Sequence, residues 1–553
     1  MSTLLRSKRM RATALRGAWT DVVVAAALAA TALVLALPAF GTSTLWRDDA
    51  WTALTIKTDG LSEFLLVAVN APGFSALLKG WLVLAGFDEW TAQVIPLLFA
   101  VAAPPLLYIV LVRRGLERVA AAMGGLLLAV SPGFLGHATR VKPYTLDAFV
   151  AVCLLGVAWW LLDDAASGRR WRLLAVAGGI ALVLSSPSAV YLAAALGTGL
   201  LALARRDCSQ LRVAFAPVAA VCAFAALWYV LVLRPAVSPA LTLFWESAFV
   251  PLDDGPRETV LATIVAVQNF ARGAISIREE PAVAIFAVAY GVALWRRPFV
   301  GLLLLAPLAI AFVLAMLEVA PVGTGRTDIY LYPAPFAAVA VALAALARTA
   351  RALANVVALA SAASLLMLAP KPAYPLEDLA PLVATLEANL SSSDAIVTYP
   401  FASYPFALYT TLPVDFTGTD VTATGFRLHV RRQNTFVPTE SWPRDPLNFA
   451  VAVDRLEERD DSVWVLVGWT LNPIIYSTPE TRASGLERSR GRREVSAFPF
   501  GRRAIRQAFG DDVALPRGVT LPQYVDRVMR NAGYRKAAPT LVRTEASLTH
   551  WLR

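Results

Sequence analysis

The sequence predicts a polytopic α-helical membrane protein with about eleven transmembrane helices, followed by a C-terminal α/β domain outside the membrane. Of its 553 residues, 57% are hydrophobic and only 16% are charged, and the mean hydropathy is +0.58. A soluble chain cannot bury that much apolar surface, so we assign the apolar runs before residue 370 to a bilayer. Two further observations support this class, namely the alternation of basic residues between loops and a change of composition at residue 370.

Eleven apolar segments have the length or nearly the length of a membrane crossing. A basic N-terminal stretch precedes the first segment, which could be a signal peptide or an uncleaved helix, and its apolar length of about 20 residues favours the helix. The fifth and sixth segments are short and are separated by SSPS at 185–188, but the charges of the later loops require both. The segments are 21–41, 91–112, 119–135, 145–162, 173–185, 188–204, 211–233, 281–295, 299–318, 331–347 and 352–369.

The distribution of basic residues predicts the orientation of these segments. If the N-terminus is cytoplasmic, the cytoplasmic loops carry 18 Lys and Arg residues in about 50 positions, counting one at a helix mouth. The outer segments before residue 370 carry 10 in about 130 positions. This asymmetry is the positive-inside pattern of membrane proteins. It also accounts for the net charge of +10 without a nucleic-acid partner.

Three regions are predicted to lie on the outer face. The loops 42–90 and 234–280 are too long to be simple connections, and both mix amphipathic stretches with aromatic residues, as segments at a membrane interface do. The region 370–553 has 22 basic and 20 acidic residues, so it is predicted to be a soluble domain. In it, a helix from about residue 379 precedes a buried strand at AIVTYP, and SVWVLVGW is a second strand. The basic stretch 488–495 is predicted to be a solvated loop.

The three cysteines, Cys153, Cys208 and Cys222, include no CxxC pair, and none lies beyond residue 222. They therefore indicate neither a disulfide framework nor a zinc site. The sequence also contains no glycine-rich phosphate loop and no internal repeat.

Polar residues gather where the outer segments meet the membrane. Asp48 and Asp49 in WRDDAW directly follow the first span, where the simplest interpretation of an acidic pair alone is a helix cap. Two further boundary segments are SPGFLGHATRVKPYTLD at 131–147 and GRTDIYLYPAPF at 325–336. A carboxylate can act as a general base towards a hydroxyl, and Arg and Lys side chains bind phosphate. Each cation alone could instead contact lipid headgroups, but the convergence of cations and carboxylates favours a site.

The order of these motifs resembles the GT-C superfamily of integral membrane glycosyltransferases, in its protein-O-mannosyltransferase-like bacterial branch. The motifs are an acidic pair after the first span, an N/H-x-P turn, a KPY-x-x-D stretch and an R-x-x-x-Y-L-x-P entry to a late helix. The resemblance covers about residues 40–400, and it implies a GT-C-like catalytic module over 1–369. It further implies that a sugar is transferred from a polyprenyl-phosphate donor to an acceptor hydroxyl on the outer face.

The resemblance also implies roles for individual residues. It places the catalytic base at Asp48, with Asp49 orienting that base or contacting the acceptor. It places the donor phosphate at Lys142 and Arg326. The remaining candidates are Arg140 for the donor phosphate and Tyr144, Asp147 and Asn70 for the donor or acceptor.

Two departures from the family pattern leave the sugar and the acceptor open. The turn reads Asn70-Ala71-Pro72-Gly73 where relatives often have His-Pro-Pro, and Arg140 stands where an acidic residue is frequent. The resemblance requires no cofactor. Some members of the superfamily bind a divalent metal at the acidic pair, so this pair is also a candidate metal site. His137 is predicted to be a core or boundary histidine rather than a ligand.

The expected partners are a polyprenyl-phosphate sugar, a lipid, glycan or protein acceptor, and membrane lipids. A single displacement would invert the anomeric centre, and the expected location is the bacterial inner membrane. One alternative is a flippase or transporter of polyprenyl lipids, although transporters usually carry polar residues at mid-bilayer and repeated halves. Another is an assembly protein with an outer sensor domain, which would leave the acidic pair and the cations without a role.

Overall fold

The structure is a computed structural model of the full chain. The residues that it describes are 2–41, 44–68, 71–161, 169–204, 208–237, 241–242, 245, 248–252, 255–275, 277–367, 378–419, 424–438, 445–456, 462–468, 521–537, 540–543 and 546–553.

Every predicted apolar segment coincides with a helix. Within the described residues, five helices are long and apolar enough to cross a membrane, or up to seven if each of two bent pairs is one crossing. The chain is therefore a multi-pass membrane protein, and eleven crossings remain a prediction. The helices are α1 (Ser2–Ala36), α5 (Glu89–Arg113), α6 (Arg118–Ala129), α8 (Tyr144–Leu161), α9 (Arg169–Ser185), α10 (Ser188–Ala204), α11 (Cys208–Trp228), α15 (Glu279–Arg296), α16 (Pro298–Met316), α17 (Pro333–Thr349) and α18 (Arg351–Met367).

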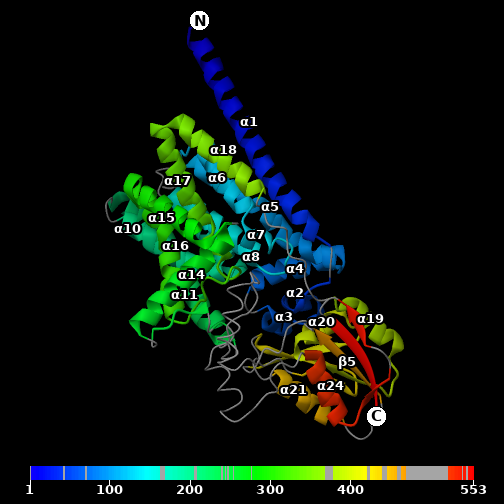
Figure 1. The fold of residues 1–553 in the computed structure, drawn as a ribbon. Helices are drawn as coiled ribbons and strands as arrows, with labels where there is room; N and C mark the ends of the chain where they lie inside the picture. Colours follow the sequence, from blue (N-terminus) through cyan, green and yellow to red (C-terminus); the bar gives the residue numbers. More distant parts are fainter. Residues whose placement is uncertain are drawn as a thin grey trace.

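These helices pack into one bundle, with the N-terminal part of α1 extending beyond it (Figure 1). Helix α5 contacts α1, α6 and α8, and α17 contacts α6 and α15. The helices approach closely at small residues, as is common between membrane helices. A Cβ atom at Gly125 of α6 would lie 2.9 Å from the carbonyl oxygen of Pro104 in α5. A glycine is therefore needed at this crossing.

Short helices fill the two long loops that the sequence places outside. The loop 42–90 forms α2 (Arg47–Ala53), α3 (Leu61–Val67) and α4 (Pro72–Ala85). The loop 234–280 forms α12 (Arg234–Ala236) and α14 (Pro256–Ala274), and a four-residue helix α7 (Pro132–Leu135) precedes α8. Helix α14 buries Phe270 and exposes Val260, Leu261 and Ile264. It thus has the amphipathic character that the sequence predicts.

The C-terminal region contains a mixed sheet with helices, as the sequence predicts. The sheet has the order β4-β1-β5-β8-β6, and β7 pairs with β8. Strands β1 (Ala395–Thr398) and β5 (Ser462–Gly468) are parallel, with Ile396 opposite Trp464, and they correspond to the two predicted strands. The other strands of this sheet are β4 (Thr435–Phe436), β6 (Arg535–Lys536), β7 (Leu541–Arg543) and β8 (Ala546–Leu552).

Helices accompany this sheet. The predicted helix near residue 379 is α19 (Ala380–Asn389), whose Leu382, Val383 and Leu386 are buried. The other helices are α20 (Ser403–Tyr409), α21 (Asp445–Asp454) and α24 (Leu521–Asn531), and an antiparallel pair β2 (Val414–Gly418) and β3 (Phe426–Val430) forms a second, smaller sheet. The predicted basic loop 488–495 lies outside the described residues.

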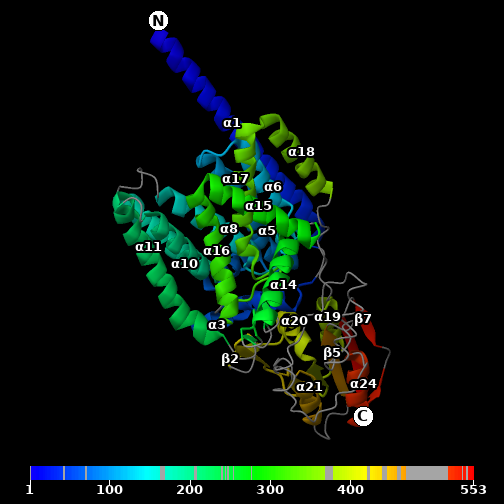
Figure 2. The same cartoon turned by 60° about the vertical axis from the view of Figure 1, so that its left-hand side comes forward.

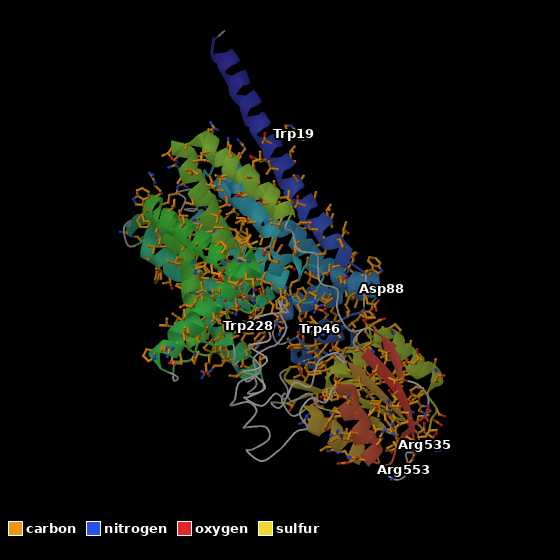
Figure 3. All side chains as sticks on the ribbon, viewed as in Figure 1. Trp19, Trp46, Asp88, Trp228, Arg535 and Arg553 are labelled. Carbon is orange, nitrogen blue, oxygen red and sulfur yellow. The ribbon has the colours of Figure 1, made fainter. Side chains whose placement is uncertain are left out.

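The C-terminal region packs directly on the helical module, with α20 against α2 and β2 against α3 (Figures 1 and 2). Helix α20 contacts α2, and the backbone N–H of Leu45 donates a hydrogen bond of 2.6 Å to the Tyr409 hydroxyl. Tyr404, Phe416 and Phe426 belong to the same buried cluster as the membrane helices. Figure 3 shows Trp46 at this junction, whereas Trp19 projects from the outside of α1.

Candidate active site

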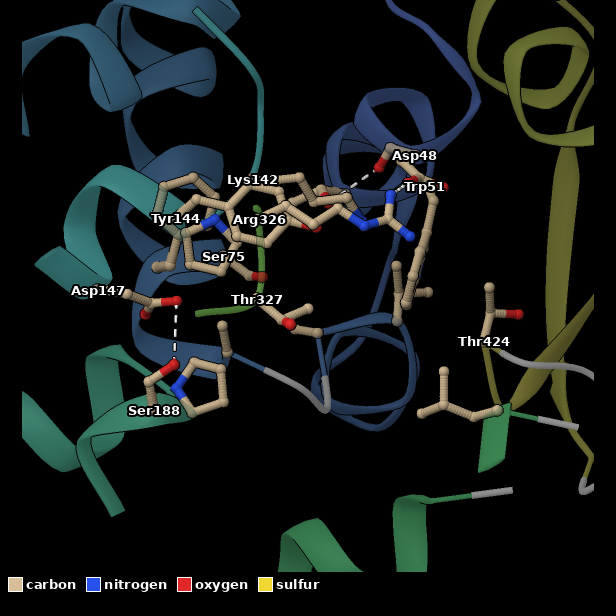
Figure 4. Close-up of a pocket in the computed structure, with 18 of the residues that line it drawn as sticks. Asp48, Trp51, Ser75, Lys142, Tyr144, Asp147, Ser188, Arg326, Thr327 and Thr424 are labelled. Carbon is tan, nitrogen blue, oxygen red and sulfur yellow. Dashed lines mark hydrogen bonds and ion pairs between the residues drawn. The ribbon is translucent and has the colours of Figure 1, made fainter. Parts of the chain in front are cut away.

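A cavity of about 250 Å³ lies where the helical module meets the C-terminal region. Asp48 and Trp51 come from α2, Asp147 from α8, and Arg326 from the loop before α17 (Figure 4). The full lining comprises Arg47, Asp48, Trp51, Thr52, Val67, Ala68, Ala71, Phe74, Ser75, Lys142, Pro143, Tyr144, Asp147, Pro187, Ser188, Leu241, Trp245, Arg326, Thr327, Tyr404 and Thr424.

The acidic pair occupies the first turn of α2, and its two carboxylates have different partners. Asp48 Oδ2 accepts a hydrogen bond of 3.0 Å from Arg326 Nη1. Asp49 Oδ2 lies 3.3 Å from Nε of Arg140, and the side chain of Asp49 is only 3% exposed. The residue at the cap position of α2 is Trp46, which makes no side-chain capping bond. The acidic pair is therefore an ion-pairing element rather than a helix cap, although its charge also suits the positive end of the helix dipole.

The pKa values of the two carboxylates are shifted in opposite directions. Burial raises the pKa of Asp48, but the combined charges of Arg326, Lys142 and neighbouring cations outweigh it and lower the pKa to about 2. Burial also raises the pKa of Asp49, and Arg140 and Lys142 do not reverse that shift. Asp48 is thus firmly ionised at neutral pH, whereas Asp49 is easier to protonate than an ordinary Asp. Such a divergence within a carboxylate pair is common in active sites.

Lys142 is a buried cation. Only 7% of it is exposed, although it belongs to a segment that the sequence places where an outer loop meets the membrane. Burial lowers its pKa to about 8, against the opposing effect of Asp48 and Asp49. Part of the lysine population is therefore neutral at mildly alkaline pH.

Each cation at the site lies over an aromatic ring. Lys142 Nζ is 3.7 Å from the centre of the Trp51 ring. Arg140 lies 4.4 Å from Trp46, Arg326 lies 4.7 Å from Trp245, and Arg47 lies 4.7 Å from Phe401. Contacts of this kind stabilise a cation that has lost part of its hydration. The two tryptophans of WRDDAW therefore contact two of the cations near its aspartates, Arg140 and Lys142.

The opposite end of the cavity is formed by Asp147 (Figure 4). This carboxylate is 4% exposed and accepts hydrogen bonds from Ser186 and Ser188, the latter at 3.3 Å. The two serines lie in SSPS between α9 and α10, so the break between the two short segments supplies both donors. Tyr144, one turn earlier on α8, meets His137 edge-on with ring centres 4.8 Å apart.

His137 is partly buried beside this cluster. Its Nδ1 lies 2.7 Å from the carbonyl oxygen of Gly133, and burial lowers its pKa to about 3. It is therefore a neutral histidine that contacts the backbone, and its position as a core or boundary residue agrees with the sequence analysis.

The loop that carries Arg326 is shaped by its own hydrogen bonds. Asp328 is fully buried and accepts hydrogen bonds from the N–H of Gly323 at 2.9 Å and from the hydroxyl of Thr324 at 3.0 Å. Gly325 has a φ of 72°, in the left-handed region that glycine adopts without strain. This turn directs Arg326 towards Asp48.

The structure brings together most of the candidates that the sequence singles out. Asp48, Lys142, Tyr144, Asp147 and Arg326 line one cavity. Asp49 and Arg140 form an ion pair behind it and, in the described part of the chain, are not among its lining residues. Asn70 lies outside the described residues.

Several lining residues do not follow from the sequence analysis. They are Trp51, Ser188, Trp245, Tyr404 and Thr424. Trp51 belongs to the WRDDAW motif, so its closeness in sequence to Asp48 was the feature that could have indicated it. Nothing near Tyr404 or Thr424 in the sequence indicates that the C-terminal region reaches the cavity.

The acidic pair does not fit a divalent metal in this arrangement. Among the described residues, no group of three His, Cys, Asp or Glu side chains could hold a metal ion. Each aspartate instead has a guanidinium partner.

Comparisons with known proteins identify the fold. Residues 69–231 match the family described as dolichyl-phosphate-mannose-protein mannosyltransferase. The crystal structure of ArnT from Cupriavidus metallidurans bound to undecaprenyl phosphate is similar with a TM-score of 0.50 and 11% identity, covering 95% of this chain and 97% of that chain. The apo structure of the same enzyme matches with a TM-score of 0.40 and 16% identity, covering 85% and 95%. The search of curated proteins gave no match.

The fold match extends over nearly the whole chain, and the family match covers α4 to the end of α11, including Lys142 and Asp147. The resemblance found in the sequence is therefore confirmed, and the chain has the fold of the GT-C integral membrane glycosyltransferases.

Proposed function

We propose that the protein transfers a sugar from a polyprenyl-phosphate-linked donor to an acceptor hydroxyl on the outer face of a bacterial inner membrane. The observation that carries this proposal is the convergence of Asp48, Lys142 and Arg326 on one cavity. The similar ArnT structure contains undecaprenyl phosphate, which supports a lipid phosphate as the ligand of the two cations. The N-terminus is then cytoplasmic and the C-terminal domain extracytoplasmic.

Binding begins at the cations. The phosphate of the donor contacts Lys142 and Arg326, while its isoprenoid chain remains in the bilayer. The sugar occupies the cavity between these cations and Asp147, with Tyr144 on its wall. Because Asp147 already accepts two serine hydroxyls, its orientation is set before the sugar arrives. Asn70, which precedes α4 in the sequence, is a further candidate for contact with the donor or the acceptor.

The chemical step is a single displacement at the anomeric carbon. The acceptor oxygen forms a bond to this carbon, and the acceptor proton passes to Asp48. The bond from the anomeric carbon to the phosphate oxygen breaks, and its electron pair leaves with polyprenyl phosphate. Lys142 and Arg326 stabilise the charge that develops on that oxygen. One displacement inverts the anomeric configuration.

Arg326 has two partners in this scheme. Its Nη1 lies 3.0 Å from Oδ2 of Asp48, and this contact keeps the pKa of Asp48 low. A phosphate that binds Arg326 competes for its guanidinium. The donor thus weakens the interaction that opposes protonation of Asp48, which favours proton transfer only when the donor is present.

The test is a transfer assay on the purified full-length protein with a panel of polyprenyl-phosphate sugars. We expect release of polyprenyl phosphate with one sugar, and loss of donor binding in Lys142→Ala and in Arg326→Ala. Arg431→Ala is the control, because Arg431 pairs with Asp415 on an exposed surface. Normal donor binding by both site variants would place the phosphate elsewhere. Transbilayer movement of the lipid without sugar transfer would instead support the flippase alternative.

A further inference from the structure

The indole of Trp51 is a buried hydrogen-bond donor at the cavity wall. Trp51 lines the cavity, and its Nε1 is buried with no hydrogen-bond partner among the described residues. Two other indoles have acceptors, since Trp81 donates to the carbonyl oxygen of Thr91 at 2.7 Å and Trp464 donates to Asp394 at 3.1 Å. A buried donor without an acceptor is destabilising and needs an explanation. At Trp51 a ligand can supply the acceptor.

Lys142 makes the same ring part of a cation site. Its ammonium lies 3.7 Å from the ring centre, and no carboxylate in the described part of the chain is within ion-pair distance of it. The ring face compensates for lost hydration without occupying the N–H donors of the ammonium, as a carboxylate would. Lys142 is therefore stabilised in the cavity while its hydrogen-bonding capacity remains available to a ligand.

Trp51 also has the right position relative to the acidic pair. It follows Asp48 by three residues on α2, so the two side chains project on the same side of the helix. Figure 4 shows both beside Arg326. The side chains of Trp51, Lys142 and Arg326, which carry an indole N–H, an ammonium and a guanidinium, consequently all line this cavity. Three donors with two positive charges match the oxygens of a phosphate better than the hydroxyls of a neutral sugar.

We propose that Trp51 is a binding residue for the donor phosphate, donating its indole N–H to a phosphate oxygen while the face of the same ring positions Lys142. This inference rests on the proposed function and adds a residue to its phosphate site. It separates two contributions of one side chain, namely a hydrogen bond from the ring edge and a cation contact on the ring face.

A comparable tryptophan in the C-terminal region shows why the cavity matters. Trp551 Nε1 is also buried without a partner among the described residues, and Lys536 lies 5.4 Å from the centre of its ring. Trp551 is in β8, and it is not among the cavity residues. An unsatisfied indole alone is therefore no sign of a ligand site. Trp551 provides a matched control for the same substitution.

The experiment measures binding of polyprenyl phosphate without a sugar to the full-length protein in lipid nanodiscs. Trp51→Phe keeps a ring under Lys142 and removes only the N–H. We expect it to bind about 10- to 100-fold more weakly, because a hydrogen bond to a charged group has that effect. Trp551→Phe should bind like the wild type. Wild-type affinity in Trp51→Phe, with the wild type binding well, would overturn this inference and leave the proposed function intact.

A second variant distinguishes the ring face from general damage to the fold. Trp51→Leu removes both the N–H and the aromatic face, so Lys142 loses a contact that favours its protonated form. We expect weaker binding than in Trp51→Phe and an alkaline loss of binding that begins at lower pH. Trp51→Phe should keep the wild-type pH profile. If all three proteins share one pH profile, the ring of Trp51 does not position Lys142. If the wild type binds no polyprenyl phosphate, the proposed class of donor is itself wrong.

Discussion

Asp48 and Asp49 are adjacent in sequence, but their side chains have different partners. Asp48 faces the cavity and Arg326, and it remains ionised because cations surround it. Asp49 is turned towards Arg140 and is more deeply buried. An ionised carboxylate at the cavity can accept a proton. The Asp49 carboxylate, which pairs with Arg140 behind the cavity, can orient α2.

The first prediction concerns this difference. Asp48→Asn keeps the size of the side chain but removes its ability to accept a proton at neutral pH, so transfer should fall by about 100- to 10,000-fold. Expression and binding of the lipid phosphate should persist. Asp49→Asn should lower the rate less, because Asp49 acts through the position of α2. Steady-state transfer assays on both variants provide the measurement, and near-normal turnover by Asp48→Asn would exclude Asp48 as the base.

The second prediction is a pH dependence. In the proposed function Lys142 binds phosphate in its protonated form, and burial lowers its pKa to about 8. The ratio kcat/KM reports the free enzyme, so it should fall as the pH rises through about 8. The pKa of Asp48, about 2, should cause no loss above pH 4. Lys142→Arg should abolish the alkaline decline, since arginine stays charged. A decline that persists in this variant would have another origin.

Residue types near the membrane boundary were sufficient to predict Asp48, Lys142 and Arg326 as one group, because all three lie in short charged motifs. Their aromatic partners could not be predicted. Trp245 reaches Arg326 across about 80 residues of chain, and such a contact depends on the tertiary arrangement. The serines that bind Asp147 were visible only as a break between two short apolar segments.

At the scale of elements, the close contact between α4 and the end of α9 supports one end of the cavity. A Cβ atom on Gly73 of α4 would lie 2.8 Å from the carbonyl oxygen of Leu184 and 2.8 Å from Cα of Ser185. Ser186 and Ser188, which donate hydrogen bonds to Asp147, come directly after this contact in the sequence. Position 73 therefore controls how closely α4 approaches the junction of α9 and α10.

The third prediction tests this contact. Gly73→Ala should force α4 and α9 apart, with a cost of about 1–3 kcal/mol in unfolding free energy that is typical of overpacking. Donor-sugar affinity should fall as Asp147 shifts. Gly80→Ala is the matched control in the same helix, where an added Cβ meets nothing within 4 Å. Thermal unfolding and transfer assays compare the two variants, and equal behaviour would show that this contact is unimportant.

The apolar helices were predictable because each depends on a local composition that the bilayer requires. The two predicted strands β1 and β5 were recognisable for a similar reason, since both are short apolar runs. The helices α2, α3 and α20 and the pair β2–β3 were not predicted individually. Their sequences are short and amphipathic, and they are stabilised mainly by contacts with one another.

At the scale of the whole molecule, orientation in the membrane is the fourth prediction. Reporters fused after residues 115, 168, 207, 297 and 349 should be cytoplasmic, because the basic residues cluster there. Fusions after residues 60, 260 and 400 should be external. A cytoplasmic signal at 400 would mean an even number of crossings and would place the C-terminal domain, and the cavity that it lines, on the cytoplasmic side, which contradicts our proposal. The eleven-span count and the domain boundary at 369–370 depend on this result.

The long-range ion pair between Asp48 and Arg326 also has a consequence in time. The two residues are 278 positions apart, so at about 5–20 residues per second a ribosome adds Arg326 roughly 14–56 s after Asp48. Tyr409, 364 positions after Leu45, follows its partner by roughly 18–73 s. A nascent chain therefore carries Asp48 without its guanidinium while most of the helices are being inserted. Synthesis that stops in this interval leaves the Asp48 carboxylate without its Arg326 partner.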